Sequence, residues 1–206
     1  MIGGELARAI GLNVPELVFM NLDESFSKAE GDQEIQDLLR FSVGLNLGLH
    51  FLSGAITYDP LVSVADELSA SKVVLLDSIL SNIDRTARNT NLLNWNRELW
   101  LIDHGASLYF HHNWNNWESH LGRTFPKISE HVLLQKATRL EEAGMQIKEM
   151  VTDQKLANII SLIPDNWLIE ESDDYQPKQK RDIYTQLLKS KLDNIDSLVK
   201  EAADAR

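Results

Sequence analysis

The sequence predicts a mainly α-helical domain that contains one short β-hairpin. Six of the ten side chains between residues 71 and 80 are apolar and form a wide stripe, which is typical of a helix buried at the centre of a domain. In the C-terminal part apolar residues recur at helical spacing, so we expect helices near 127–150, 153–163 and 177–203. The segment 90–102 instead has the pattern of two strands joined by a tight turn.

The N-terminal part is expected to be mixed in structure. Residues 4–10 should form a short helix, and residues 14–22 should be extended. The polar segment 23–31 is expected to be a loop, and Asp32 is a suitable N-cap for a second helix. Residues 44–60 contain several glycines and are expected to be irregular, with close backbone packing or a ligand-facing loop.

The central elements have clear boundary signals. Ser71 is expected to cap the buried helix, which ends near residue 80. Asn96 and Arg97 lie between the two predicted strands, 90–95 and 98–102, where a two-residue hairpin turn fits. An acidic linker is expected over residues 170–177, before the last helix.

The composition argues against several classes of protein. The 206 residues carry a net charge of −11, which makes the chain a poor binder of nucleic acid or of an anionic membrane. The chain has no cysteine, so it has neither disulfides nor cysteine zinc sites. Its most apolar stretch, residues 41–56, falls short of the roughly 20 apolar residues that cross a bilayer. We see no signal peptide and expect a cytoplasmic protein.

Two polar segments at the ends of the predicted hairpin have the residues that phosphoryl transfer requires. The first contains Asp84 and, five positions later, Asn89; the second contains Asp103 followed by His104 and Gly105. Phosphoryl transfer needs a carboxylate that orients the attacking hydroxyl, together with oxygen ligands for Mg²⁺. A hairpin between Asn89 and Asp103 would bring two such ligands together at its open end.

This pattern has a plainer explanation. An Asp and an Asn at this spacing occur by chance in many proteins, and Asp84 and Asp103 could simply form turns and caps. The residues alone leave both interpretations open.

Taken together, the two segments resemble the catalytic and metal-binding loops of HipA-like kinases and, more distantly, those of phosphatidylinositol kinases. The resemblance rests on NIDRTARN at 82–89 and LIDHGA at 101–106. It covers residues 1–125 with specific motifs, and the helical remainder in general character. The other similar stretches lie at residues 6–12, 14–16, 44–46, 54–57, 59–60 and 109–112.

The resemblance implies a kinase-like C-terminal lobe. Residues 1–22 would form the helix and hinge between two lobes, 23–169 the lobe with its catalytic and metal loops, and 170–206 a linker and a helix that packs on the lobe. The activity implied is an ATP- and Mg²⁺-dependent transfer of phosphate to a hydroxyl of a protein or a small molecule.

The resemblance also implies a role for each site residue. Asp84 would be the catalytic base, Asn89 a Mg²⁺ ligand at the nucleotide, and Asp103 the principal Mg²⁺ ligand. Arg85 could neutralise charge near the phosphate, or form a salt bridge with a nearby acid. His104 is expected to pack and hydrogen-bond rather than to act as a base.

The chain departs from the family pattern at its start. HipA-like kinases begin with a strand-rich lobe that carries a Gly-rich phosphate loop and a phosphate-binding Lys. Neither Lys28 nor Lys72 matches that Lys, and Met1 lies just after the Glu that holds it. We therefore expect the 206 residues alone to show little activity. The alternative function is a non-catalytic kinase-lobe remnant that binds a protein.

Several partners are expected on these grounds: a nucleotide, a protein substrate, and a polypeptide that supplies the missing lobe. We also expect an apolar surface around Leu6, Ile10, Val18 and Met20, which a homodimer would cover.

Histidines and tryptophans could indicate other sites. Adjacent His111 and His112 would point apart in an extended chain, so with His120 they favour packing or surface roles over a metal site. The five tryptophans are scattered, which favours packing over a base-stacking platform.

Overall fold

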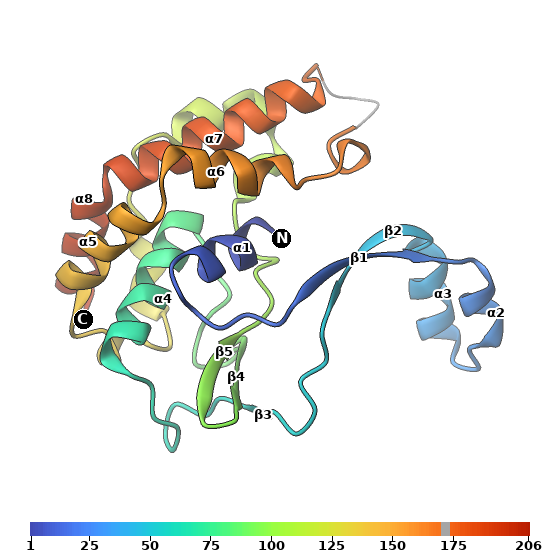
Figure 1. Cartoon of the computed structure of the whole chain (residues 1–206), viewed down its shortest axis with the longest axis horizontal. Coiled ribbons are helices and arrows are strands. Elements are labelled where there is room, and N and C mark those ends of the chain that lie inside the picture. The colour runs from blue at the N-terminus through green and yellow to red at the C-terminus, as the bar shows by residue number, and fades with distance from the viewer. Residues whose placement is uncertain (170–173) are drawn as a thin grey trace. The chain divides into compact units, whose positions relative to one another are not determined.

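The computed structural model of the chain describes residues 1–169 and 174–206, which form two units. The smaller unit consists mainly of Pro15–Ser53, and the larger of Ile2–Val14 with Gly54–Arg206. About half of the chain is helical and its sheets are small and antiparallel, so the predicted mainly α fold with a short hairpin is confirmed (Figure 1). The first half of the predicted acidic linker lies outside the described residues.

Helix α4 (Glu67–Leu80) is the central element of the larger unit, as its apolar sequence predicts. Each residue from Ala70 to Leu80 is buried. Neighbouring helices cover it on several sides: α1 (Ile2–Ala9), α5 (Leu140–Met150), α7 (Pro177–Asp193) and α8 (Ile195–Ala205). Burying a side chain such as Leu or Ile contributes about 1.5–3 kcal/mol, so this helix is a rigid base for the segments at its ends.

The cap of α4 differs from the prediction. Asp66 is the N-cap, and its carboxylate accepts a hydrogen bond from the Ser69 backbone N–H at 2.8 Å. Ser71 lies within the helix, where its hydroxyl donates to the carbonyl of Glu67 at 2.7 Å. Because the Asp66 side chain caps the helix in place of Ser71, the helix begins about one turn earlier than predicted.

The predicted C-terminal helices are confirmed in part. Helix α6 (Asp153–Ser161) agrees, but the span predicted as 127–150 begins with 3₁₀ turns, η3 (Pro126–Glu130) and η4 (Leu134–Lys136). His131 Nδ1 accepts the Leu133 N–H there at 3.0 Å, a local bond that competes with a regular helix.

A break at Asn194 separates α7 from α8, so the single helix predicted over 177–203 is wrong. The Asn194 side chain donates to the Gly122 carbonyl at 3.1 Å, and the residue has non-helical backbone angles. A further 3₁₀ turn, η5 (Asp165–Trp167), precedes α7.

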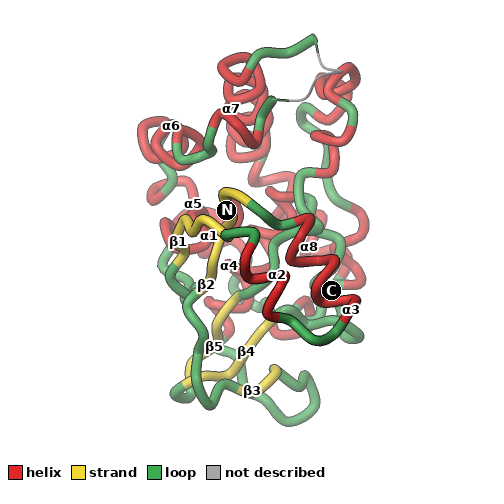
Figure 2. The backbone as a smooth tube through the Cα atoms, turned by 90° about the vertical axis from the view of Figure 1, so that its right-hand side faces the viewer, coloured by secondary structure: helices red, strands yellow, loops and turns green. Residues whose placement is uncertain are grey.

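The predicted hairpin is present. Strands β4 (Leu92–Trp95) and β5 (Glu98–Leu101) pair antiparallel, and β3 (Ile56–Thr57) adds to the outer side of β4 (Figure 2). Asn96 and Arg97 both have left-handed backbones, with φ of 52° and 67°, as a two-residue turn with the strand twist requires.

Aromatic side chains fill the segment after the hairpin, η1 (Tyr109–His112) and η2 (Trp114–His120). The rings of Phe110, Trp114 and Tyr184 lie edge to face, with centroids 5.3–5.6 Å apart. Trp95 and Trp100 pack in the same way on the hairpin, at 5.1 Å. These tryptophans therefore have the packing role that their scatter favours.

The smaller unit contains the antiparallel strands β1 (Leu17–Leu22) and β2 (Gly44–Leu49), and the helices α2 (Ser25–Ala29) and α3 (Gln33–Phe41). The first strand and the Asp32 cap are confirmed; the Asp32 carboxylate accepts the N–H groups of residues 34 and 35 at 2.9 and 3.2 Å.

Two predictions in the smaller unit are wrong. The segment 23–31 contains a helix, and residues 44–49 form a strand rather than an irregular segment. Gly48 lies opposite Val18, and a Cβ there would be 2.7 Å from the Met20 sulfur. This glycine therefore indicates close packing within a ribbon, not a loop.

The expected apolar surface is also only half right. Leu6 and Ile10 are 2% and 1% exposed, because α1 packs on α4 and α6. Val18 and Met20 are 45% and 49% exposed. No helix among the described residues is long and apolar enough to cross a lipid bilayer.

The η1 segment should make the fold sensitive to acid. Burial, followed by the charge of His112, lowers the pKa of His111 to about 4, and its Nδ1 lies 3.2 Å from the Tyr184 hydroxyl. The unfolded chain takes up this proton nearer pH 6.5. The resulting stability is present above about pH 6.5 and is lost as the pH falls toward 4.

Between pH 7 and pH 4.5 the free energy of unfolding of the parent chain should fall by about 1–2 kcal/mol more than that of His111→Asn. Urea unfolding at the two pH values measures both changes. His50→Asn, at an exposed position, is the control and should follow the parent. Equal losses in all three proteins would contradict the buried, neutral state of His111.

Candidate functional site

A buried ion pair fixes the segment that carries Asp84. Asp77, in α4, and Arg85 both have fully buried side chains, and Arg85 Nε donates to Asp77 Oδ2 at 2.6 Å. His131 Nε2 lies 2.9 Å from the same oxygen, and Asn82 Nδ2 donates to the other at 2.9 Å. Of the two roles open to Arg85 in the sequence, the structure therefore has the salt bridge.

The Asp77 carboxylate is charged in the folded protein. Burial alone would raise its pKa, but the Arg85 guanidinium and then His131 outweigh burial and hold the pKa well below the usual range. An ion pair in a low-dielectric interior is maintained only when further hydrogen bonds satisfy its atoms. The bonds from Asn82 and His131 do this for Asp77.

Arg85 also joins the two candidate loops to each other. Its Nη1 donates to the carbonyl of Asn91, in the first segment, and to that of Ile102 at 3.4 Å, just before Asp103. Two backbone bonds reinforce this connection: Ile102 N–H to the Asn91 carbonyl at 3.1 Å, and Ile83 N–H to the Ala106 carbonyl at 3.2 Å. The loop that contains Asp84 and the loop that contains Asp103 therefore run side by side.

Asp84 and Asn89 are in direct contact. Asn89 Nδ2 donates to Asp84 Oδ2 at 2.7 Å, and Asn91 Nδ2 donates to the same oxygen at 3.2 Å. The Thr86 N–H donates to the Asn89 carbonyl at 2.9 Å, which closes the turn between Asp84 and Asn89. Asp84 is partly exposed and Asn89 is exposed, so both are accessible to a ligand.

Asp103 makes the sharp turn of the second loop itself. Its φ is 45°, in the left-handed region that few residues other than Gly, Asn and Asp adopt. Its Oδ1 accepts the Gly105 N–H at 3.0 Å, and a Cβ at Gly105 would lie only 3.0 Å from that oxygen. The glycine therefore leaves room for the carboxylate.

His104 has a packing position. Its side chain lies against α1, where a Cβ on Gly3 would be 2.8 Å from the His104 Cβ. Burial, and then the charge of Arg85, lower the pKa of His104 to about 4. The ring is thus neutral near pH 7, in agreement with packing rather than base chemistry.

A cavity of about 790 Å³ opens beside Asn89. This volume is within the range of small-molecule sites, about 300–1,000 Å³. Among the described residues that line it, Arg88 is the only cation. The other lining residues include Tyr58, Asp59, Asn91, Leu93 and Ile102.

The donor set suits a hard cation. The Asp103 carboxylate and the Asn89 amide oxygen are of the ligand types that Mg²⁺ takes in proteins. Within the described ranges, this site included, no group of three or more His, Asp or Glu side chains is arranged to hold a metal. His111 and His112 stack edge to face, with centroids 4.6 Å apart.

A family model described as HipA-like kinase matches residues 1–197. The chain belongs to the HipA-like kinase family. This confirms the resemblance seen in its two loops, and it supports a kinase-type, phosphotransferase function at the level of the family. Searches among curated proteins and among solved structures found no match to this HipA-like chain.

Sequence reasoning missed the residues beneath the loops of this HipA-like kinase: Asp77, Asn82 and His131. A signal for Asp77 was present, because it is the only carboxylate in the apolar run 71–80. A buried carboxylate needs a partner. His131, 54 residues further on, has no comparable signal.

Asp77→Asn should strongly destabilise the larger unit. It would leave the Arg85 guanidinium buried without its counter-charge, a loss of about 3–5 kcal/mol in comparable pairs. Asp196→Asn is the control, since Asp196 is 88% exposed in its pair with Lys148 and should contribute at most about 1 kcal/mol. The measurement is chemical unfolding at pH 7. Similar small losses in both variants would show that the loops do not depend on the buried pair.

Proposed function

We propose that Asp84, Asn89 and Asp103 form the base and magnesium site of an ATP-dependent phosphotransferase with a kinase-like C-terminal lobe. The observation that carries this proposal is the 2.7 Å contact between Asn89 and Asp84, beside a loop that presents Asp103. Membership of the HipA-like kinase family supports it.

In this proposal Asp84 orients the acceptor hydroxyl. A carboxylate only accepts hydrogen bonds, so it can hold the hydroxyl proton and receive it as the phosphate is transferred. The amides of Asn89 and Asn91 hold one of its oxygens at 2.7 and 3.2 Å. The acceptor is a hydroxyl of a protein or of a small molecule.

Asn89 and Asp103 would hold the metal. Because Asn89 directs its amide nitrogen to Asp84, its amide oxygen remains for a cation. One carboxylate oxygen of Asp103 accepts the Gly105 N–H, and the residue is exposed, so the other oxygen can bind a cation. Bound Mg²⁺ would neutralise charge on the transferring phosphate. The cavity beside Asn89 is the proposed nucleotide pocket.

The test is Mg²⁺-dependent binding of a fluorescent ATP analogue. Asp103→Asn should raise the Kd at least about tenfold, which corresponds to 1.4 kcal/mol, whereas Asp84→Asn should bind nucleotide normally and lose transfer. Asp196→Asn is the matched control. Nucleotide binding that needs neither Mg²⁺ nor Asp103 would contradict the proposal.

Phosphate transfer by residues 1–206 alone should be slow. Loss of one preorganised charge-stabilising donor lowers rates by roughly 10²–10³, and Arg88 is the only cation among the described residues of the cavity wall. We propose that a polypeptide supplying a phosphate-binding Lys completes the site.

A second candidate function, protein binding, is favoured by the smaller unit. Its β1–β2 ribbon is apolar on both faces: Val18 and Met20 lie on one, and Phe19 on the other, each 45–49% exposed. A two-stranded ribbon is marginally stable alone, and exposed apolar patches commonly bind proteins. Phe41, at the end of α3, is 90% exposed. We propose that a second copy of the chain covers this ribbon.

Met20→Lys should then shift the purified chain toward monomer, because a charge in an apolar interface is costly to desolvate. The measurement is light scattering across a concentration series. Met145→Lys, on exposed α5 surface of the larger unit (66% exposed), is the matched control and should leave association unchanged. A parent chain that is monomeric at every concentration would rule out self-association.

A further inference from the structure

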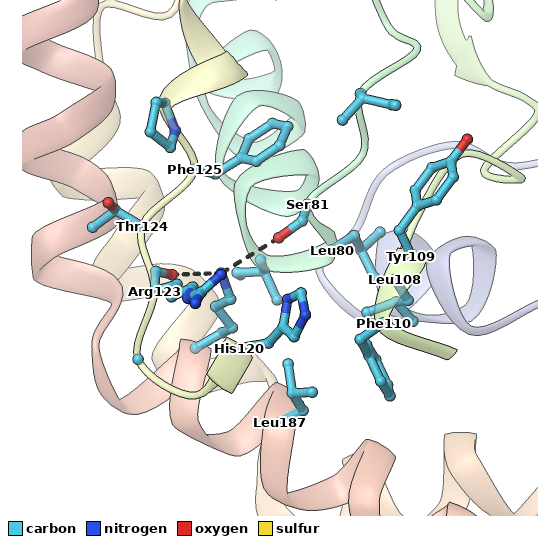
Figure 3. A pocket seen from close by; sticks show the side chains of 15 residues that line it. Leu80, Ser81, Leu108, Tyr109, Phe110, His120, Arg123, Thr124, Phe125 and Leu187 are labelled. Carbon is cyan, nitrogen blue, oxygen red and sulfur yellow. Dashed lines mark hydrogen bonds between the residues drawn. The ribbon is translucent and has the colours of Figure 1, made fainter. Parts of the chain in front are cut away.

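A second cavity, of about 700 Å³, lies behind the loop that carries Asp84. Figure 3 shows its walls: the end of α4 at Leu80 and Ser81, the segment at Leu108–Phe110, the stretch His120–Phe125, and Leu187 from α7. Most of its wall is apolar, from Leu80, Ile83, Leu108, Phe110, Phe125 and Leu187. This cavity shares no lining residue with the one beside Asn89.

The charges of the wall have a single sign. Arg123 and Lys191 line the cavity beside His120, and none of the described lining residues is acidic. Burial, followed by the charges of Arg123 and Lys191, lowers the pKa of His120, so Arg123 and Lys191 are the cations of the wall. This contrasts with a chain whose net charge is −11. A basic apolar cavity in an acidic protein attracts anions, because nearby low-dielectric walls strengthen the local field.

Lys191 is the most unusual of these three residues. It is 2% exposed, and its Nζ donates to the Arg123 carbonyl at 2.5 Å and to the Ser81 hydroxyl at 3.4 Å. Burial lowers the pKa of Lys191, and the charge of Glu201 offsets this in part. The Glu201 carboxylate itself accepts the Phe125 N–H. Within the described chain, Lys191 has no salt bridge.

A buried ammonium without an ion pair is costly, by several kcal/mol in typical interiors. The bonds from Lys191 go to neutral oxygens, so its positive charge is not balanced by contact. An anion in the cavity would balance it and would displace water from the apolar wall. Both effects favour the same kind of ligand.

We propose that this cavity binds an amphipathic carboxylic acid, with the carboxylate at Lys191 and Arg123 and the hydrocarbon against Leu80, Ile83 and Leu187. A volume of about 700 Å³ is ample for a chain of medium length. This binding site stands whether or not the phosphotransferase proposal holds.

The ligand would contact both candidate loops from behind. Ile83 directly precedes Asp84, and Leu108 follows the loop of Asp103. The Leu108 N–H donates to the Leu80 carbonyl at 2.8 Å, which joins the second loop to the end of α4. Occupancy would therefore stabilise the junction from which both loops extend.

Calorimetric titration with octanoate tests the proposal, beside 1-octanol as the neutral analogue and inorganic phosphate as an anion without a hydrocarbon. We expect one octanoate per chain, octanol weaker by at least about tenfold, and no binding of phosphate alone. Equal affinity for octanoate and octanol, or no octanoate binding, would overturn it. Phosphate binding as tight as that of octanoate would overturn the amphipathic class.

Variants locate the site. Lys191→Met keeps the side-chain length and should weaken octanoate at least about tenfold while leaving octanol unchanged. Lys200→Met, in an exposed pair with Asp204, is the matched control. Arg123→Gln, at an exposed position, should fold and bind several-fold more weakly, so it tests the site if Lys191→Met does not fold. Two combinations of results would overturn the assignment. In both, Arg123→Gln binds octanoate as tightly as the parent; in addition, Lys191→Met either binds it as tightly as Lys200→Met or does not fold.

Discussion

The ion pair between Asp77 and Arg85 is the interaction on which the geometry of both loops depends. Asp77 belongs to α4, which neighbouring helices hold on several sides, so its carboxylate has a fixed position. Arg85 takes its position from that carboxylate at 2.6 Å. It then binds the carbonyls of Asn91 and Ile102, one in each loop. The rigidity of a buried helix is thus transmitted to the polar segments at the surface.

In this arrangement the neighbouring residues Asp84 and Arg85 have different positions. Arg85 is directed into the core, while Asp84, the preceding residue, is partly exposed. Adjacent side chains in a non-helical segment tend to point in opposite directions, so Arg85 anchors the segment and Asp84 lies toward solvent. A guanidinium suits the anchor, because its fork of donors can reach a carboxylate and two carbonyls together. A lysine carries its three donors on one nitrogen and lacks this planar fork.

The sequence predicts features that short-range chemistry determines, and it fails where distant residues decide. The hairpin follows from its strand pattern and from the Asn96–Arg97 turn, and the contact of Asp84 with Asn89 lies within one loop. The role of Asp77 depends on His131, which is distant in sequence. The β2 strand was missed because Gly48, opposite Val18, looks like a loop residue until its close neighbour is known. The helix predicted over residues 127–150 is not continuous, because the Leu133 N–H bonds to the His131 side chain in place of a helical carbonyl.

The cavity beside Asn89 and the cavity beside Lys191 are linked through this same network. Asn91 and Ile102 line one cavity, and Ile83 and Leu108 line the other. Arg85 binds the carbonyls of the first two residues, while Ile83 is hydrogen-bonded to Ala106 and Leu108 to Leu80. A ligand in either cavity therefore contacts residues whose backbone is held by α4 and its charged partner. Energetic coupling between sites requires an element whose state both ligands bias. The loop pair held by Arg85 contributes wall residues to both cavities, so it is the element through which we expect one ligand to influence the other.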